Sequence, residues 1–260
     1  MILLRKELQK LRLGKVELYL LERIEERGCI HIALLDPLKT KLEEAGKLAR
    51  LCEESGSDAI MVGGSTVFSQ NHMDLFIQEI KSKVSIPVII FPNNIQSISR
   101  YADAIWFMSL LNSVDWYFIV GAQMQGALSI KAFGLEAIPM GYLVFGGDTA
   151  VAAMGRVLPL PTNKPEVVVC YGLAAQYLGM RFLYLEAGSG AEKPIPPEVI
   201  KAVSENVSIP VIVGGGIRTP EAAEHAVKAG AQAIVTGTAV EQDTRRLSEI
   251  VAAIHKADKT

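Results

Sequence analysis

Residues 184–190, with the sequence YLEAGSG, combine a carboxylate with a serine that lies between two glycines. A glycine-rich turn after a strand exposes backbone N–H groups that bind phosphate, whereas Glu186 would repel a phosphate and suits a general base. The two features conflict if both meet the same anion. The segment therefore raises the question of why a carboxylate lies so close to a predicted phosphate-binding turn.

Two more glycine turns support an anion site. GGGIRTP (214–220) and GTAVE (237–241) each follow an apolar run and lead toward a helical segment. There the positive end of a helix and backbone N–H groups would face an anion, and the missing side chains would let it approach. A single glycine run also serves tight turns, so the phosphate site is predicted from the two turns together.

Oxygen ligands for a metal are also present. Asp36 ends the apolar run of LLDPLKT, and Ser65 lies in VGGSTVF after the next run. A carboxylate, a hydroxyl, water and substrate phosphates form a shell that suits Mg²⁺. An Asp before Pro also begins turns, and Ser65 also fits a helix N-cap, so these alternatives remain open. The four histidines have no spacing typical of zinc, and core or surface roles are expected for them.

Eight short apolar runs must position these groups, and helical segments separate them. The runs span 29–36, 58–63, 86–91, 103–108, 136–145, 181–187, 209–214 and 232–237. They are apolar on both faces, as are parallel strands covered by helices. The pattern predicts a (β/α)₈ TIM barrel in one domain, residues 1–260, with 1–27 as an additional N-terminal helix. Active groups of such barrels lie at the C-terminal strand ends, with a phosphate commonly bound after strands seven and eight.

An internal similarity agrees with a barrel. Residues 84–109 resemble 207–238, so the third and fourth runs match the seventh and eighth, although two βαβ units of an open sheet would give the same similarity. Residues 146–166 are expected to form a long insertion or lid, and the start of the helix within 112–134 stays open. Residues 101–111 are expected in the core, and an apolar groove lined by Phe91, Trp106, Phe107 and Met108 is a second interpretation.

Composition excludes several classes of protein. The net charge is −2 and no segment is dense in Lys and Arg, which argues against a nucleic-acid partner. Three cysteines without CxxC spacing indicate reduced thiols and a cytoplasmic protein. The N-terminal segment lacks the pattern of a signal peptide, and no run is long enough to span a bilayer.

Several motifs together resemble one family. LLDPLK, SGSDAIMVGGST, YADAIWFMSLLNS, IVGAQ, NKPE, AAQYLGMRFLYLEAGSGA, IPVIVGGGIRTPEAA and GTAVE are similar to geranylgeranylglyceryl phosphate synthases, a family that also contains bacterial heptaprenylglyceryl phosphate synthases. The resemblance covers nearly the whole chain from about residue 28. The chain is more similar to the larger group, whose members carry an added N-terminal helix.

The resemblance implies a Mg²⁺-dependent prenyltransferase. Such an enzyme joins geranylgeranyl diphosphate to the C3 hydroxyl of sn-glycerol 1-phosphate and releases pyrophosphate, a step of ether lipid biosynthesis. Asp36 and Ser65 match the metal positions, and Glu186 is expected to act as base or to orient the hydroxyl. The positions that hold glycerol phosphate match Tyr184, Leu185, Glu186, Ala187, Gly188, Ser189, Gly190, Gly215, Gly216, Gly237 and Thr238.

The remaining expectations concern partners and departures from the family pattern. We expect a homodimer or larger homo-oligomer, no stable membrane insertion, and at most a transient membrane contact for the lipid product. Residues 67–68, 93–94 and 146–157 depart from the usual sequence and bear on prenyl-chain fit, and Thr238 stands where many members have Asn. The alternatives are another barrel enzyme acting on a phosphorylated metabolite, such as an isomerase or epimerase, and a barrel that binds ligand without catalysis.

Overall fold

The computed structural model describes residues 13–64, 69–237 and 244–257, and its strands close into a barrel. The eight strands are β1 (Ile30–Leu35), β2 (Ala59–Val62), β3 (Val88–Ile90), β4 (Ala104–Leu110), β5 (Glu136–Val144), β6 (Phe182–Glu186), β7 (Val211–Gly214) and β8 (Ala233–Thr236). Each strand pairs in parallel with its neighbours in chain order, and β8 pairs with β1. The predicted (β/α)₈ barrel is confirmed.

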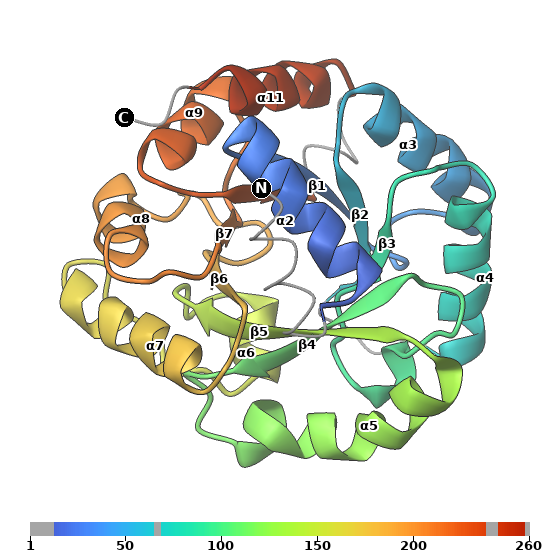
Figure 1. Ribbon diagram of the computed structural model, residues 1–260, viewed down its shortest axis with the longest axis horizontal. Helices are drawn as coiled ribbons and strands as arrows, with labels where there is room; N and C mark the ends of the chain where they lie inside the picture. The colour runs from blue at the N-terminus through green and yellow to red at the C-terminus, as the bar shows by residue number, and fades with distance from the viewer. Residues whose placement is uncertain (1–12, 65–68, 238–243, 258–260) are drawn as a thin grey trace.

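Helices form a ring outside the strands (Figure 1). They are α3 (Leu42–Glu54), α4 (Gln70–Lys81), α5 (Ala122–Phe133), α6 (Ala150–Met154), α7 (Pro165–Tyr177), α8 (Pro197–Ser204), α9 (Pro220–Lys228) and α11 (Thr244–Lys256). The start of α9 illustrates the local cause, because the Thr219 hydroxyl accepts a hydrogen bond from the Ala222 N–H and Pro220 occupies the first turn. Within the described residues, no helix has the length and apolar character needed to cross a membrane.

The core has an inner and an outer layer because successive side chains of a strand face opposite sides. Ile32, Met61 and Trp106 pack together inside the barrel, and their neighbours Ala33, Ile60 and Ile105 pack against the surrounding helices. The inner layer fills the barrel below the C-terminal strand ends, as is usual for this fold. The site must therefore lie above this layer.

The connection between β3 and β4 departs from the regular repeat. A single 3₁₀ turn, η1 (Ile95–Ser97), takes the place of a helix there, and the Asn94 side chain caps it by accepting from the Gln96 N–H at 2.7 Å. The matching connection between β7 and β8 carries the full helix α9. The internal similarity therefore extends to the strands but not to the helix between them. As a result, only the short η1 turn connects β3 to β4 on the outside of the barrel.

The segment whose helix start the sequence left open, 112–134, and the expected insertion, 146–166, both contain helical structure. A π-helical turn, η2 (Tyr117–Gly121), precedes α5, and α5 ends at Gly134, whose φ of 66° suits glycine. The expected insertion 146–166 contains α6, which the Thr149 hydroxyl caps. The segments that follow β5 and β6 lie close together here, because a Cβ on Gly188 would be 2.2 Å from the Thr149 side chain.

The N-terminal helix α2 (Lys15–Arg27) crosses the N-terminal end of the barrel (Figure 1). Its Leu20 belongs to the inner core layer. The carboxylate of Glu136, the first residue of β5, accepts from the N–H groups of Val16 and Glu17 at 2.9 and 2.8 Å, and the buried Glu17 carboxylate pairs with Arg181. The predicted helical extension is thus described over residues 15–27, and residues 1–12 lie outside the described part.

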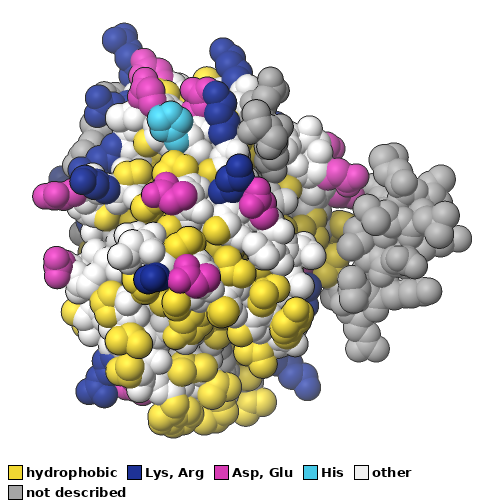
Figure 2. All heavy atoms as spheres, turned by 90° about the vertical axis from the view of Figure 1, so that its left-hand side faces the viewer, with side chains coloured by type: hydrophobic (Ala, Val, Ile, Leu, Met, Phe, Trp, Pro, Cys, Tyr) yellow, Lys and Arg dark blue, Asp and Glu magenta, His cyan; other side chains and the backbone are white. Residues whose placement is uncertain are grey.

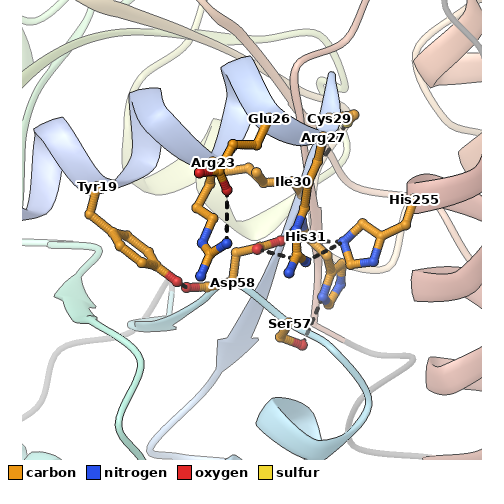
Figure 3. Close-up of polar contacts among 10 residues, drawn as sticks. All are labelled: Tyr19, Arg23, Glu26, Arg27, Cys29, Ile30, His31, Ser57, Asp58 and His255. Carbon is orange, nitrogen blue, oxygen red and sulfur yellow. Dashed lines mark hydrogen bonds and ion pairs between the residues drawn. The ribbon is translucent and has the colours of Figure 1, made fainter.

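A polar cluster fixes the other end of α2 (Figure 3). The Asp58 carboxylate lies 3.0 Å from Arg27 and 3.4 Å from His255 of α11, and it accepts from the backbone N–H of His31 at 3.0 Å. His31 is fully buried, and its ring nitrogens lie 2.9 Å from Ser57 Oγ and 2.8 Å from Thr236 Oγ1. The core role expected for His31 is what the structure has.

Candidate active site

Glu186 ends β6 at the C-terminal end of the barrel. Its residue is 6% exposed, and its Oε1 accepts from the Gly188 N–H at 2.6 Å. Burial raises the pKa of the Glu186 carboxyl, and the Gly188 hydrogen bond and the nearby hydroxyls of Tyr184 and Tyr142 offset part of that increase. A carboxylate whose pKa is raised is a stronger base and is therefore better suited to accept a proton.

The glycines around Glu186 are required by geometry. Gly188, Gly190 and Gly215 have φ values of 110°, 82° and 80°, a region that favours glycine. A Cβ on Gly215 would also lie 2.5 Å from the Glu186 carboxylate. The loops after β6 and β7 therefore approach each other closely only because these side chains are absent.

A small cavity of about 60 Å³ lies beside Glu186 and fits the predicted anion site. Its lining brings together residues from the ends of β1, β6, β7 and β8: Leu34, Tyr184, Glu186, Ser189, Gly190, Gly215, Gly216, Ile217, Arg218, Val235, Thr236 and Gly237. Seven residues proposed for glycerol phosphate are among them. Backbone groups of glycines at adjacent strand ends thus surround one small space.

Four of the other predicted positions need comment. Leu185 and Ala187 do not line this cavity, because their side chains are buried with the outer core layer. This follows from alternation along β6, which turns Tyr184 and Glu186 inward and Leu185 outward. Gly188 acts through its N–H on Glu186, and Thr238 lies outside the described residues.

Asp36 follows β1, and it lines a larger cavity whose lining also includes Glu186. Its Oδ1 accepts from the Leu38 N–H at 2.9 Å, so the alternative turn role is also present. Its Oδ2 lies 3.8 Å from Lys39 Nζ, and a Cβ on Gly64 would fall 2.5 Å from the carboxylate. Ser65, its predicted partner for a metal, lies outside the described residues.

The donor set around Asp36 fits Mg²⁺. Among the described residues, no group of three His, Cys, Asp or Glu side chains could hold a metal ion. Mg²⁺ does not need such a cage, since it keeps several waters and binds through one or two carboxylates together with substrate phosphates. Asp36 offers Oδ2 for this purpose because its other oxygen already accepts the Leu38 N–H.

The larger cavity, about 340 Å³, runs from Asp36 and Glu186 toward the side of the barrel that lacks a helix. Its far part passes between the η1 segment, at Ile95 and Ile98, and α5, at Gly126 and Ile130. Its lining also includes all four residues of the predicted groove: Phe91, Trp106, Phe107 and Met108. Trp106 and Met108 belong to the inner layer and Phe107 to the outer, so the cavity passes the strand ends into the helix layer.

Three aromatic rings pack against one another beside Glu186. Phe91, Tyr142 and Tyr184 lie with ring centroids 5.3–5.6 Å apart. The Tyr184 hydroxyl is buried and has no hydrogen-bond partner of standard geometry among the described residues. A Cβ on Gly214 would lie 2.0 Å from that hydroxyl, so the glycine makes room for it. An unsatisfied buried donor at this position is available to a substrate.

Sequence reasoning missed three residues of the site. Tyr142 lines the larger cavity, and its inward direction follows from its even spacing with Met140 and Val144 along β5. Arg218 lines the small cavity and donates to the Gly190 carbonyl at 3.1 Å. Lys39 stands between Asp36 and Ser189. The two cations lie within the motifs GGGIR and DPLK, where a basic residue beside a glycine turn or a carboxylate could have indicated them.

Comparison with known proteins agrees with this geometry. The profile of the PcrB family matches residues 21–255. The geranylgeranylglyceryl phosphate synthases of Thermofilum pendens and Pyrococcus horikoshii are 49% and 52% identical, covering 95% and 90% of this chain and 96% and 91% of theirs. A crystal structure of (S)-3-O-geranylgeranylglyceryl phosphate synthase from Thermoplasma acidophilum, in complex with substrate sn-glycerol-1-phosphate, superposes with a TM-score of 0.89 at 42% identity, covering 94% of this chain and 99% of that one.

The profile match spans most of the chain, and both synthases exceed 30% identity over nearly their full length. Coverage extends over all eight strands and over both loops that flank Glu186. The chain belongs to the PcrB family.

Proposed function

We propose that this protein joins geranylgeranyl diphosphate to the C3 hydroxyl of sn-glycerol 1-phosphate and releases pyrophosphate. The observation that carries the proposal is the meeting of two unlike cavities at Glu186, one small and surrounded by glycines, the other long and apolar. A phosphorylated three-carbon acceptor suits the first and a prenyl chain suits the second. The names of the relatives at about half identity support the same reaction.

The acceptor would bind through its phosphate in the small cavity. Backbone N–H groups near Gly215, Gly216 and Gly237 and the Ser189 hydroxyl are the proposed donors, with Arg218 close by. Glycine turns suit this task because the backbone can approach the phosphate. The glycerol backbone then extends toward Glu186, which separates the carboxylate from the anion by the length of the substrate.

Glu186 is the proposed base for the C3 hydroxyl. A hydroxyl is too weak an acid to lose its proton to a carboxylate beforehand, so proton transfer accompanies formation of the carbon–oxygen bond. The Gly188 N–H orients the carboxylate, and the Tyr184 hydroxyl is positioned to donate to a substrate oxygen. Both contributions position the reacting groups.

Asp36, with Ser65, is the proposed ligand set for Mg²⁺. The ion, when bound with the prenyl diphosphate, would offset the negative charge of the leaving group. Asp36 faces the polar end of the larger cavity, so the diphosphate would lie there and the first prenyl carbon would point toward the acceptor hydroxyl. The apolar residues from Phe91 to Ile130 would then hold the chain and exclude water.

We also propose that the protein forms a homo-oligomer. Large apolar side chains are more than half exposed on α5, α7 and adjoining segments: Val114, Trp116, Val120, Met124, Leu128, Leu158, Tyr177 and Leu178. Figure 2 shows hydrophobic side chains gathered in the lower half of one face of the molecule. Helices α5 and α7 carry one charged residue each, Lys131 and Glu166. A face with so few charges meets its own copy without like-charge repulsion. Sedimentation velocity tests this, and a monomer at micromolar concentration would contradict it.

Turnover with defined substrates tests the main proposal. The protein would be incubated with labelled sn-glycerol 1-phosphate, Mg²⁺ and prenyl diphosphates of several chain lengths, and the lipid product and pyrophosphate would be quantified. We expect product with geranylgeranyl diphosphate and a loss of turnover when Mg²⁺ is chelated. Absence of product with every prenyl diphosphate would instead favour a barrel enzyme for another phosphorylated metabolite, or a barrel that binds without catalysis.

A further inference from the structure

Lys39 is the one cation among the described residues that line the larger cavity. The other charged residues of that lining are Asp36 and Glu186, both acidic. A diphosphate that enters between two carboxylates meets repulsion, which a cation must offset. The position of Lys39 at the polar end of the cavity therefore matters for any anionic ligand there.

The backbone of Lys39 is held by a tight turn that starts at Asp36. The N–H groups of Lys39 and Thr40 donate to the Asp36 carbonyl at 3.0 and 2.9 Å. The lysine side chain is about half exposed and extends from this fixed turn over the mouth of the site. The turn thus determines which part of the cavity the ammonium group can reach.

The contacts of the ammonium group with Asp36 and Ser189 are long. Nζ lies 3.8 Å from Asp36 Oδ2 and 3.4 Å from Ser189 Oγ, whereas charge-assisted hydrogen bonds measure about 2.7–2.9 Å. These contacts are weak, so exchanging them for contacts with a phosphate oxygen costs little. A cation bound at Asp36 Oδ2 would repel the ammonium group and favour that exchange.

We propose that Lys39 binds the diphosphate of the prenyl donor and stabilises the charge that develops on the departing pyrophosphate, an inference that rests on the proposed function. In that step the bond between the first prenyl carbon and the diphosphate oxygen breaks, and its electron pair stays on pyrophosphate. The acceptor oxygen bonds to the carbon, and its proton passes to Glu186. Lys39 remains protonated and acts through charge placed where negative charge develops.

The alternative role, binding the phosphate of the acceptor, fits the geometry less well. Ser189 and Gly190 line the small cavity, and Arg218 supplies a cation there, but Lys39 does not line it. Lys39 lines only the larger cavity of the two. The shared contact with Ser189 makes Lys39 the link between the two sites while its charge serves the donor side.

Calorimetric titration with pyrophosphate and Mg²⁺ tests the proposal without turnover. Lys39→Met should weaken pyrophosphate binding by roughly 10- to 100-fold, the effect of one charged hydrogen bond, and leave sn-glycerol 1-phosphate binding within twofold of wild type. Lys39→Arg should recover part of the loss. The matched control is Lys47→Met, which removes an exposed lysine of α3, and thermal melting checks that all variants fold.

Two outcomes of the titrations overturn the inference: pyrophosphate binding by Lys39→Met within twofold of wild type, or an equal loss of glycerol phosphate binding. Steady-state kinetics add a second readout, since kcat/KM for the prenyl diphosphate should fall while KM for the acceptor stays constant. If the wild-type protein turns over and Lys39→Met matches it, the inference fails alone. If the wild-type protein makes no product, the proposed function fails, and the pyrophosphate titration still decides the role of Lys39.

Discussion

Replacing Glu186 by glutamine should separate catalysis from stability. Glutamine has nearly the same shape, and its carbonyl oxygen keeps the hydrogen bond from the Gly188 N–H that measures 2.6 Å in the structure. The loop after β6 should therefore stay in place. The amide cannot accept a proton, so kcat should fall by about 10²- to 10⁴-fold, the usual contribution of a general base.

The free energy of unfolding of Glu186→Gln should equal or exceed that of wild type. Burial raises the pKa of Glu186, so its ionised form lowers the free energy of unfolding at pH values above its ordinary pKa. Glutamine removes that charge, and the melting temperature of Glu186→Gln should equal or exceed that of wild type. A variant that loses activity because it unfolds would show the reverse.

The assay is pyrophosphate release under saturating Mg²⁺, measured across pH, with thermal melting in parallel. In wild type kcat/KM should rise with pH until it passes the raised pKa of Glu186, and this acidic limb should be absent from the residual activity of the variant. Glu192→Gln, which removes an exposed carboxylate from the same loop, is the control and should retain full activity. Turnover of Glu186→Gln within tenfold of wild type would refute the role of base.

Three further predictions concern the metal, the glycine contact and the buried histidine. Asp36→Asn should raise the Mg²⁺ concentration needed for half-maximal activity at least tenfold, and an unchanged Mg²⁺ titration would contradict its role as ligand. Gly215→Ala should lower kcat more than tenfold, because the new methyl group would lie 2.5 Å from the Glu186 carboxylate and its φ of 80° disfavours alanine; wild-type kinetics would show that the loop simply yields. Burial lowers the pKa of His31 from 6.5 to about 3, so the unfolded chain binds a proton that the folded protein excludes. His31 therefore lowers the free energy of unfolding as pH falls from 6.5 toward 3, by about 3 kcal/mol between pH 7 and pH 4. Urea unfolding should show the deficit of His31→Gln shrinking by that amount over this range, and a constant deficit would contradict the assignment.

The strands could be predicted because a buried parallel strand needs apolar residues on both faces. Each of the eight expected runs overlaps one strand of the structure, and their ends differ by two residues or fewer. The glycines after β6 and β7 could also be predicted, since a positive φ and a close approach to Glu186 leave glycine as the residue that fits. These requirements depend on residues that are close together in the chain, so they can be recognised in the sequence.

The directions of side chains and the distances between residues of different strands and loops were harder to predict. YLEAGSG was expected to hold the acceptor over its whole length, yet Leu185 and Ala187 point into the outer core layer. Tyr142 was missed because nothing in β5 distinguishes it from its apolar neighbours until Phe91, which follows β3, and Tyr184 of β6 pack against it. Lys39 and Arg218 were missed because their value depends on which loops face each other across the barrel.

The sequence by itself determined the order of strands, the glycine turns and the placement of Glu186 and Asp36 at strand ends, because periodicity and backbone conformation are set within a few residues. Only the tertiary structure decided that the connection after β3 would lack a helix and that α5 would stand opposite it. That arrangement opens a long apolar cavity beside the small anion cavity, with Glu186 in the lining of both. In the proposed complex the closed barrel keeps the Glu186 carboxylate apart from the phosphate by the length of the acceptor. A carboxylate beside a phosphate-binding turn is then no electrostatic conflict.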